Sequence, residues 1–405
     1  MNDLPIELLE LCLPKIDLKW AMQVGGRVCR RWRSILLLGN SPIEYTHVLQ
    51  GSERLQIFNE KLTFFLAIVA KRFNFWSGNQ HFASFMEDLN VIGAQGNRIR
   101  QLDLSYSTIE LNINYRGLFP EGLCTLKLDS IWYLSDLSPL ARCTKLQELS
   151  IRRTNVMELG PILHLTSLRK LDFSHSPVLD SSSVTRLVNL RELGMSFTKA
   201  SDGFDHIQNL NQLENLSMVG CGIQRLSALN LAPERPCALK SLDLTLNEIE
   251  DLSFLKIVGS QLIYLGLGGN SQLRDVSMIG RYCRKLTTLI LYGTQVTRIR
   301  DLVECRCLEI LDLSGVRGLT TLEGISELQE LRILDLSNCC LQDLTELGAL
   351  RALLTLNLET MHAHYDLQEL QGVRLRHLSC SMPRAMADLD VENLILNGRQ
   401  VMWKT

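Results

Sequence analysis

The sequence predicts an α/β solenoid, in which short repeats each add one strand to a long parallel sheet. The main observation is a pattern of the form L-x-x-L-x-L that recurs from residue 99 onward, with successive copies starting 22 to 24 residues apart almost throughout. Within each copy the apolar residues alternate with other residues, which is the period of a β-strand. Further apolar residues then follow at intervals of three, which suits a short 3₁₀ or single-turn helix.

The pattern can be followed through fourteen copies. They start at Ile99, Leu123, Leu146, Leu168, Leu190, Leu213, Leu239, Leu262, Leu286, Leu308, Leu331, Leu353, Leu375 and Val391. The spacing widens to 26 residues after Leu213, where a proline-containing loop is inserted, and narrows to 16 before Val391. No single copy can bury its leucines, but stacked copies share one continuous core. At about 4.8 Å per strand, fourteen strands would form a sheet about 65 Å long.

The copy that starts at Leu331 illustrates how each repeat is expected to fold. Leu334 and Leu336 alternate with Ile333 and Asp335, so the leucines should face the core and the other two the solvent. Residue nine of a copy is usually Asn, Ser, Thr or Cys, whose side chain can satisfy backbone groups of the turn after the strand. Burying one leucine is worth about 1.5–3 kcal/mol, so three or four per repeat exceed the ordering cost only when neighbours are present.

These repeats resemble the leucine-rich-repeat family over about three quarters of the chain. Their short period is similar to the class found in phosphatase-regulatory and internalin-type proteins, whereas ribonuclease-inhibitor-type repeats need several more residues. The resemblance implies an arc with a parallel sheet on its concave side. We therefore expect a solenoid domain over residues 99–405.

Residues 1–39 lack this period and carry helix signals instead. The order LPIELL, IDL and VCRRWRSI resembles the F-box, a motif of about forty residues that docks on the adaptor of an SCF-type cullin–RING ubiquitin ligase. The matching positions are Leu4, Pro5, Glu7, Leu8, Leu9, Asp17, Leu18, Val28, Cys29, Trp32 and Ile35. Pro14 and the pair Gly25-Gly26 depart from the pattern, because they shorten the first helix and loosen the segment before Val28.

By this resemblance, the residues that would contact the adaptor are Leu4, Pro5, Leu8, Leu9, Leu18, Val28, Trp32 and Ile35. The alternative is that residues 1–39 only form a helical cap over the first repeat, as repeat arrays require. Residues 40–98 are expected to link the F-box to the solenoid through two helices, over 52–73 and 80–92, with a degenerate repeat around Tyr45–Leu49. Val401 and Trp403 are expected to close the far end.

Composition and motifs argue against several functional classes. A formal net charge of −2 predicts no nucleic-acid binding, and the longest apolar run, Leu62–Ala70, is too short to span a membrane. The twelve cysteines form no CxxC pair, which predicts reduced thiols in a cytoplasmic or possibly nuclear protein. Gly266 and Gly268 are interpreted as strand residues, and His362-x-His364 lacks a third metal ligand. We therefore expect no catalytic residue, no cofactor and no metal.

The working surface is expected on the concave face of the sheet. The residues predicted to bind a partner there are Arg152, Lys170, Asp172, Tyr264, Ile290, Tyr292, Ile310, Asp312, Ile333 and Asp335. Exposed tyrosine and isoleucine side chains on adjacent strands are typical of a binding hot spot, although the same residues also favour strand pairing. About nine acids against three or four bases on this face favour a basic partner.

Taken together, the sequence predicts the substrate-recognition subunit of an SCF-type ligase. It would be a monomer outside the complex, bind the adaptor and cullin, and present the repeats to an unknown target protein. The alternative is a ligase-independent scaffold or phosphatase-regulatory protein, which the short repeats suggest. An enzyme is the third option, and it lacks a candidate site.

Overall fold

The computed structural model describes residues 43–48, 70–76, 100–103, 105, 119, 121–199, 210–226, 238–341, 343–361, 367–370, 372–381, 390–396 and 399–401. The predicted F-box, His362, His364 and Trp403 lie outside these residues. The chain divides into two compact units, unit 1 (Met1–Gly194) and unit 2 (Met195–Thr405).

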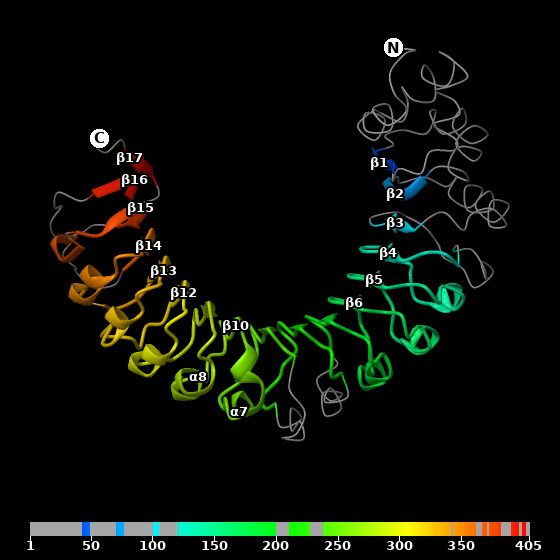
Figure 1. Cartoon of the computed structure of the whole chain (residues 1–405), viewed down its shortest axis with the longest axis horizontal. Coiled ribbons are helices and arrows are strands. Elements are labelled where there is room, and N and C mark those ends of the chain that lie inside the picture. The colour runs from blue at the N-terminus through cyan, green and yellow to red at the C-terminus, as the bar shows by residue number, and fades with distance from the viewer. Residues whose placement is uncertain are drawn as a thin grey trace, which may run out of the picture. The chain divides into compact units, whose positions relative to one another are not determined.

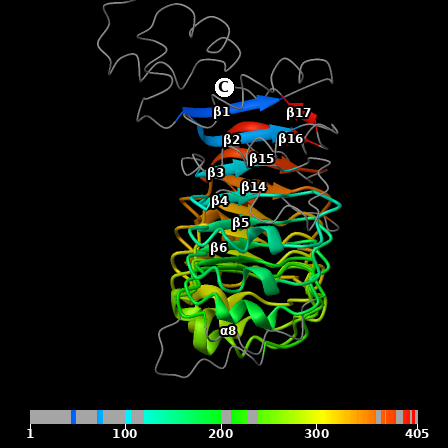
Figure 2. The ribbon, with the colours of Figure 1, turned by 90° about the vertical axis from the view of Figure 1, so that its right-hand side faces the viewer.

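Unit 1 is built on a ladder of parallel strands. These are β1 (Ile43–Val48), β2 (Ala70–Trp76), β3 (Gln101–Asp103), β4 (Thr125–Lys127), β5 (Glu148–Ser150), β6 (Lys170–Asp172) and β7 (Glu192–Gly194). Each strand pairs in parallel with the next along the chain, and Figure 2 shows β1 to β6 one below another. The short 3₁₀ helices between them are η5 (Ser138–Leu140), η6 (Gly160–Ile162) and η7 (Ser182–Arg186).

Unit 2 continues the same type of ladder. Its strands are β8 (Asn215–Ser217), β9 (Ser241–Asp243), β10 (Tyr264–Gly266), β11 (Thr288–Ile290), β12 (Ile310–Asp312), β13 (Ile333–Asp335), β14 (Thr355–Leu358), β15 (Arg374–Cys380), β16 (Asp390–Leu396) and β17 (Arg399–Val401). Strands β8 to β16 pair in parallel with their neighbours, whereas β17 runs antiparallel to β16.

The helices of unit 2 lie on the side of the stack away from the strands (Figure 1). They are α7 (Leu255–Val258), η10 (Gly259–Gln261), α8 (Ser277–Tyr282), η11 (Arg300–Glu304), η12 (Ile325–Glu327), η13 (Thr345–Ala349) and η14 (Leu367–Leu370). They fall where the sequence predicts short 3₁₀ or single-turn segments. Each turn buries leucine or another apolar residue beneath the sheet, as Leu347 does in η13.

The repeat frame confirms the predicted strands β3 to β16. Counting from the first residue of each copy, a described strand covers positions three to five in all fourteen. Position four is buried in every copy, from Leu102 to Leu394, and position six is buried from Leu128 to Cys380. These two rows of side chains form the core, which is why the period of the leucines fixes the register of the sheet.

The segment before residue 99 corrects one prediction. A helix was predicted over 52–73, but strand β2 begins at Ala70 and pairs in parallel with β3, where Phe73 is the partner of Leu102. Phe73 therefore takes the register position of a core leucine. The residues FNFW also alternate and are rich in aromatics, which favours a strand. Strand β1 lies where a degenerate repeat was expected, and Val401 pairs with Leu394 at the other end.

The residue at position eight lies in the turn that follows each strand. In the copies from Leu123 to Leu353 the residue at this position has a positive φ, between 52° and 72°. Glycine adopts this conformation without strain and stands there in four copies (Gly220, Gly269, Gly293 and Gly315). Bulky Phe197 and Leu246 also occupy it, which costs about 1–2 kcal/mol per residue.

Position nine confirms the predicted role of small polar side chains. The Nδ2 group of Asn247 donates to the carbonyls of Met218 (2.8 Å) and Leu244 (2.9 Å), while its Oδ1 accepts from the backbone N–H groups of Cys221 (3.0 Å) and Ile223 (3.1 Å). Asn247 thus joins two repeats. Cysteine serves the same purpose in other copies, where its thiol donates to a carbonyl of the preceding repeat.

We expect Asn247→Ala to destabilise unit 2 by about 3 kcal/mol, because it leaves two buried backbone N–H groups without an acceptor. Asn247 is 4% exposed, so water cannot replace the lost bonds. The matched control is Asn155→Ala, which removes an exposed side chain that donates to the Trp132 carbonyl and should cost less than about 1 kcal/mol. Denaturant midpoints measure both variants, and equal losses would contradict the role of Asn247.

Candidate protein-interaction surface

The side chains at positions three, five and seven point away from the core, and we call the surface that they form the open face. In β13 the three positions differ clearly, since Ile333 is 40% exposed, Leu334 is 1% exposed and Asp335 is half-buried. All ten residues predicted to bind a partner lie on open faces. Three of them belong to unit 1 (Arg152, Lys170 and Asp172), and seven belong to unit 2 (Tyr264, Ile290, Tyr292, Ile310, Asp312, Ile333 and Asp335).

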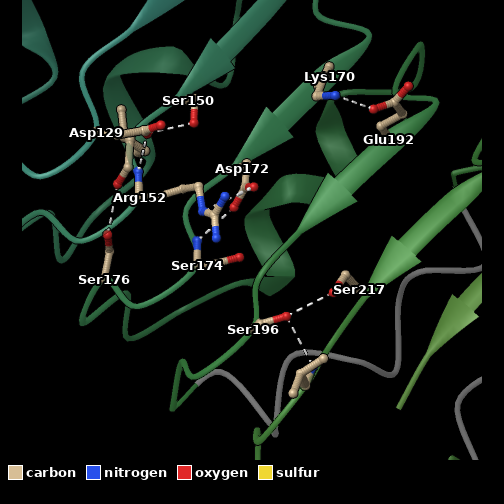
Figure 3. A network of polar contacts seen from close by, with 12 residues as sticks. Asp129, Ser150, Arg152, Lys170, Asp172, Ser174, Ser176, Glu192, Ser196 and Ser217 are labelled. Atoms are coloured by element: carbon tan, nitrogen blue, oxygen red, sulfur yellow. Dashed lines mark hydrogen bonds and ion pairs between the residues drawn. The ribbon is translucent and has the colours of Figure 1, made fainter. Parts of the chain in front are cut away.

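The basic side chains on the open face of unit 1 are paired with carboxylates of adjacent strands (Figure 3). Arg152 Nε lies 3.6 Å from Asp172 Oδ2, and Lys170 pairs with Glu192. Lys127 Nζ lies 3.9 Å from an oxygen of Asp103 on the neighbouring strand. The hydrogen bond with Glu192 raises the pKa of Lys170. Such exposed pairs contribute about 0–1 kcal/mol each, and they leave no basic side chain on this face without a carboxylate beside it.

Aspartates at position five have a structural role in the turn after each strand, which the sequence analysis did not predict. In Asp172, Asp243, Asp312 and Asp335, Oδ1 accepts the backbone N–H two residues further on, at 2.9–3.1 Å. Asn357 makes the same bond at 3.1 Å, so the turn needs the oxygen but not the charge. The sequence signal for this role is the repeated D-x-S or D-x-T, an Asx turn.

The open face of unit 2 has a different balance of charge. Positions three, five and seven of the copies that contain β8 to β16 hold Asp243, Asp312, Asp335 and Glu359, with neither Lys nor Arg among the described residues. None of the three aspartates forms an ion pair with a described residue. The nearby cations at position two, Lys240 and Arg332, are themselves paired with glutamates.

Two tyrosines lie among these carboxylates. Burial, followed by the charge of Asp243 and a hydrogen bond to it, raises the pKa of Tyr264 to about 12. Burial also raises the pKa of Tyr292, with further contributions from the charges of Asp243 and Asp312. Both hydroxyl groups therefore stay protonated near neutral pH and act as hydrogen-bond donors beside the carboxylates.

Two glycines make this arrangement possible. Both were interpreted from the sequence as strand residues; Gly266 is the last residue of β10, whereas Gly268 lies in the turn that follows, and both are buried. A Cβ on Gly266 would lie 2.5 Å from Oδ1 of Asp243, and a Cβ on Gly268 would lie 2.4 Å from ring atoms of Tyr292. The carboxylate of Asp243 therefore lies against the backbone at the end of β10, and the Tyr292 ring lies against the turn that follows. The sequence shows the glycines but not which side chains cover them.

Isoleucine side chains on this face lie on adjacent strands. Ile310 pairs with Ile333 in the register of β12 and β13, while Ile290 lies beside Gly266. Two further exposed apolar side chains, Phe197 and Leu246, were not predicted, because position eight normally favours glycine. The ring of Phe197 leans over Gly220, and the side chain of Leu246 leans over Gly269.

Unit 1 carries a second set of exposed apolar residues outside the open face. Trp132, Tyr133, Met157 and Leu179 follow the strand turns of three successive repeats and are 53–68% exposed. Backbone bonds from Asn155 to the Leu134 carbonyl and from Leu179 to the Met157 carbonyl connect these segments. Trp132 and Tyr133 take the place of a single residue in the next repeat, so a one-residue insertion exposes them.

Three further observations concern buried thiols, metal ligands and membrane-spanning helices. Burial raises the pKa of Cys283 and Cys305 to about 12, so their thiols stay protonated near neutral pH. Among the described residues, no three His, Cys, Asp or Glu side chains are grouped so as to hold a metal ion. The described part of the chain also contains no helix with the length and apolar character needed to cross a membrane.

A stack of single-strand repeats with tyrosine, isoleucine and aspartate side chains on its open face defines a solenoid, an architecture whose extended faces serve as binding surfaces. A family model described as a leucine-rich repeat matches residues 236–253. A leucine-rich-repeat protein from Leptospira interrogans has a similar structure, with 17% identity, coverage of 93% of this chain and 88% of that chain, and a TM-score of 0.66. An internalin from Listeria monocytogenes is 21% identical over 71% of this chain and 82% of its own, with a TM-score of 0.51.

No curated protein matches the chain. The fold is therefore that of leucine-rich-repeat proteins, which confirms this part of the sequence prediction. The identities below 25% establish the fold alone. The F-box lies outside the described residues and stays a prediction.

Proposed function

We propose that the chain is the substrate-recognition subunit of an SCF-type cullin–RING ubiquitin ligase. Residues 1–39 would bind the adaptor, and the open face of the repeats would hold the target protein. The observation that carries the proposal is the order LPIELL, IDL and VCRRWRSI directly ahead of a protein-binding solenoid. Such a subunit would work in the cytoplasm or the nucleus.

The proposed mechanism is one of proximity. No residue of this chain needs to perform acid–base or nucleophilic chemistry, because other subunits would transfer ubiquitin. Holding the target next to the conjugating enzyme raises its effective concentration, and a bimolecular encounter becomes an intramolecular one. An array of repeats suits this task, since it offers the target an extended binding surface.

The test is binding of the purified adaptor to the full chain. Trp32→Ala should lower adaptor affinity at least tenfold, because a large aromatic side chain at a protein interface is typically a hot spot. The matched control is Trp132→Ala, which removes an exposed tryptophan from unit 1 and should leave adaptor binding unchanged. Recovery of the adaptor at the wild-type level by Trp32→Ala would contradict the proposal.

Deleting residues 1–39 tests the alternative scaffold function. If these residues form an F-box, the repeats should melt at nearly the same temperature without them, since the two parts fold separately. If they only cap the first repeat, the deletion should expose its apolar edge and lower the melting temperature strongly. Co-purification of a cullin and the adaptor in stoichiometric amounts from native cells provides the independent check.

A further inference from the structure

The open face of unit 2 has four carboxylates and neither Lys nor Arg among the described residues, whereas the same face of unit 1 has five carboxylates and three basic side chains. In unit 1, each of the three basic side chains on the open face lies within 4 Å of a carboxylate. In unit 2, Asp243 and Asp312 face a described surface with no Lys or Arg at positions three, five and seven. This contrast within one molecule favours a partner that brings its own positive charge.

The two tyrosines favour a planar cation at this surface. The Tyr292 ring lies against Gly268, and the charges of Asp243 and Asp312 both act on its hydroxyl group. Asp243 lies over Gly266, where its Oδ1 accepts the backbone N–H of Thr245, and its charge acts on the hydroxyl group of Tyr264. A planar cation could stack on the ring and pair with a carboxylate at the same time.

We propose that Asp243, Tyr264, Tyr292 and Asp312 form a subsite for an arginine side chain of an extended, basic segment in the target protein. Arginine fits better than lysine because its guanidinium group is planar, weakly hydrated and able to pair with a carboxylate through two N–H groups. It also stacks on aromatic rings, whereas an ammonium group acts as a compact, strongly hydrated charge.

The neighbouring strands supply an apolar contact for the same segment. Ile310 lies on β12 together with Asp312, its register partner on β13 is Ile333, and Ile333 is 40% exposed. An apolar residue near the arginine would cover these isoleucines and exclude water from the charged pair. Shielding from water strengthens both the stacking and the ion pair, as at the centre of a binding hot spot. The subsite rests on the proposed role in target binding and does not depend on residues 1–39.

The experiment begins with a random 12-residue peptide display library selected against the immobilised full chain. Selected sequences should share an arginine, and a synthetic peptide with citrulline in its place should bind at least tenfold more weakly. Citrulline keeps the planar shape, but a carbonyl oxygen replaces one nitrogen of the guanidinium group, which removes the charge and two of the five N–H donors. Affinity for the arginine peptide should also fall between 50 and 300 mM salt, because screening weakens the ion pair.

The key variant is Asp243→Asn, which should weaken binding of the arginine peptide at least tenfold. Asn357 makes the same turn bond as Asp243, so the substitution removes charge while keeping the local structure. The matched control is Asp172→Asn, at the same position of a repeat in unit 1, which should change affinity less than twofold. Tyr292→Leu is a second variant, and the loss of the ring should weaken binding severalfold.

Several results would contradict the proposed arginine subsite. These are selection of peptides without arginine, failure to select any peptide, equal affinity for the citrulline peptide, and equal losses for Asp243→Asn and Asp172→Asn. Adaptor binding is measured separately with Trp32→Ala. The subsite can therefore fail while the ligase function stands, and the reverse is also possible.

Discussion

Replacing Gly280 with Ala is expected to destabilise unit 2 by about 3 kcal/mol or more, because the added methyl group has no space. Gly280 is buried in α8, where the helix packs against η11 of the next repeat. A Cβ at this position would lie 1.7 Å from the carbonyl oxygen of Asp301 and 2.8 Å from its carbonyl carbon. The obstacle is backbone, so two neighbouring repeats must move apart.

The matched control is Gly160→Ala in η6, where a Cβ would meet no atom within 4 Å. This substitution should change the free energy of unfolding by less than about 0.5 kcal/mol. Chemical denaturation followed by circular dichroism compares the two variants. A wild-type midpoint for Gly280→Ala would mean that α8 and η11 do not approach each other as described.

The second large effect is expected for Phe173→Ala in unit 1, with a loss of about 3–5 kcal/mol. Phe173 is 0% exposed and stands at position six, where most copies have leucine. Its removal leaves a cavity between repeats whose backbones are fixed by strand pairing, so the surrounding core can collapse only partly. The denaturant midpoint measures the loss of stability. Amide hydrogen exchange, as a second measurement, reports on unit 1.

Phe197→Ala serves as the control for phenylalanine removal. Phe197 is 46% exposed, has a φ of 55° and leans over Gly220 rather than into the core. We expect it to cost about 1 kcal/mol or less, because little buried surface is lost. Similar losses for Phe173→Ala and Phe197→Ala would contradict the assignment of the core.

The strands of the repeats could be predicted because one physical rule repeats in every copy. Leucines at positions four and six must face the same core, so alternation and period together define β3 to β16. Strand β2 was predicted wrongly in part because the run LTFFLAIVAKRF is apolar almost throughout. Such a run lacks the alternation that separates a strand from a buried helix, and the pairing of Phe73 with Tyr45 on β1 and with Leu102 on β3 is seen only in the structure.

The members of the open face could be predicted, but their contacts could not. Alternation places Arg152, Lys170 and Tyr264 on this face whatever their partners are. The direction of each side chain depends on its neighbours in space, and Lys170 pairs with Glu192 on the next strand. Likewise, only the structure shows that the ring of Tyr292 lies over Gly268. The sequence therefore predicts the surface, and the packing of side chains determines where charge remains unbalanced on it.

The reversed strand β17 has a consequence for self-assembly. A ladder of parallel strands has an edge whose backbone groups can accept another strand, so stacked repeats are in principle able to grow end to end into fibres. At the β16 end of unit 2 the chain turns back, and Arg399–Val401 pairs antiparallel with Leu394–Leu396. A second molecule would meet this short reversed strand before the parallel ladder, so it cannot extend the ladder in its own register at that end.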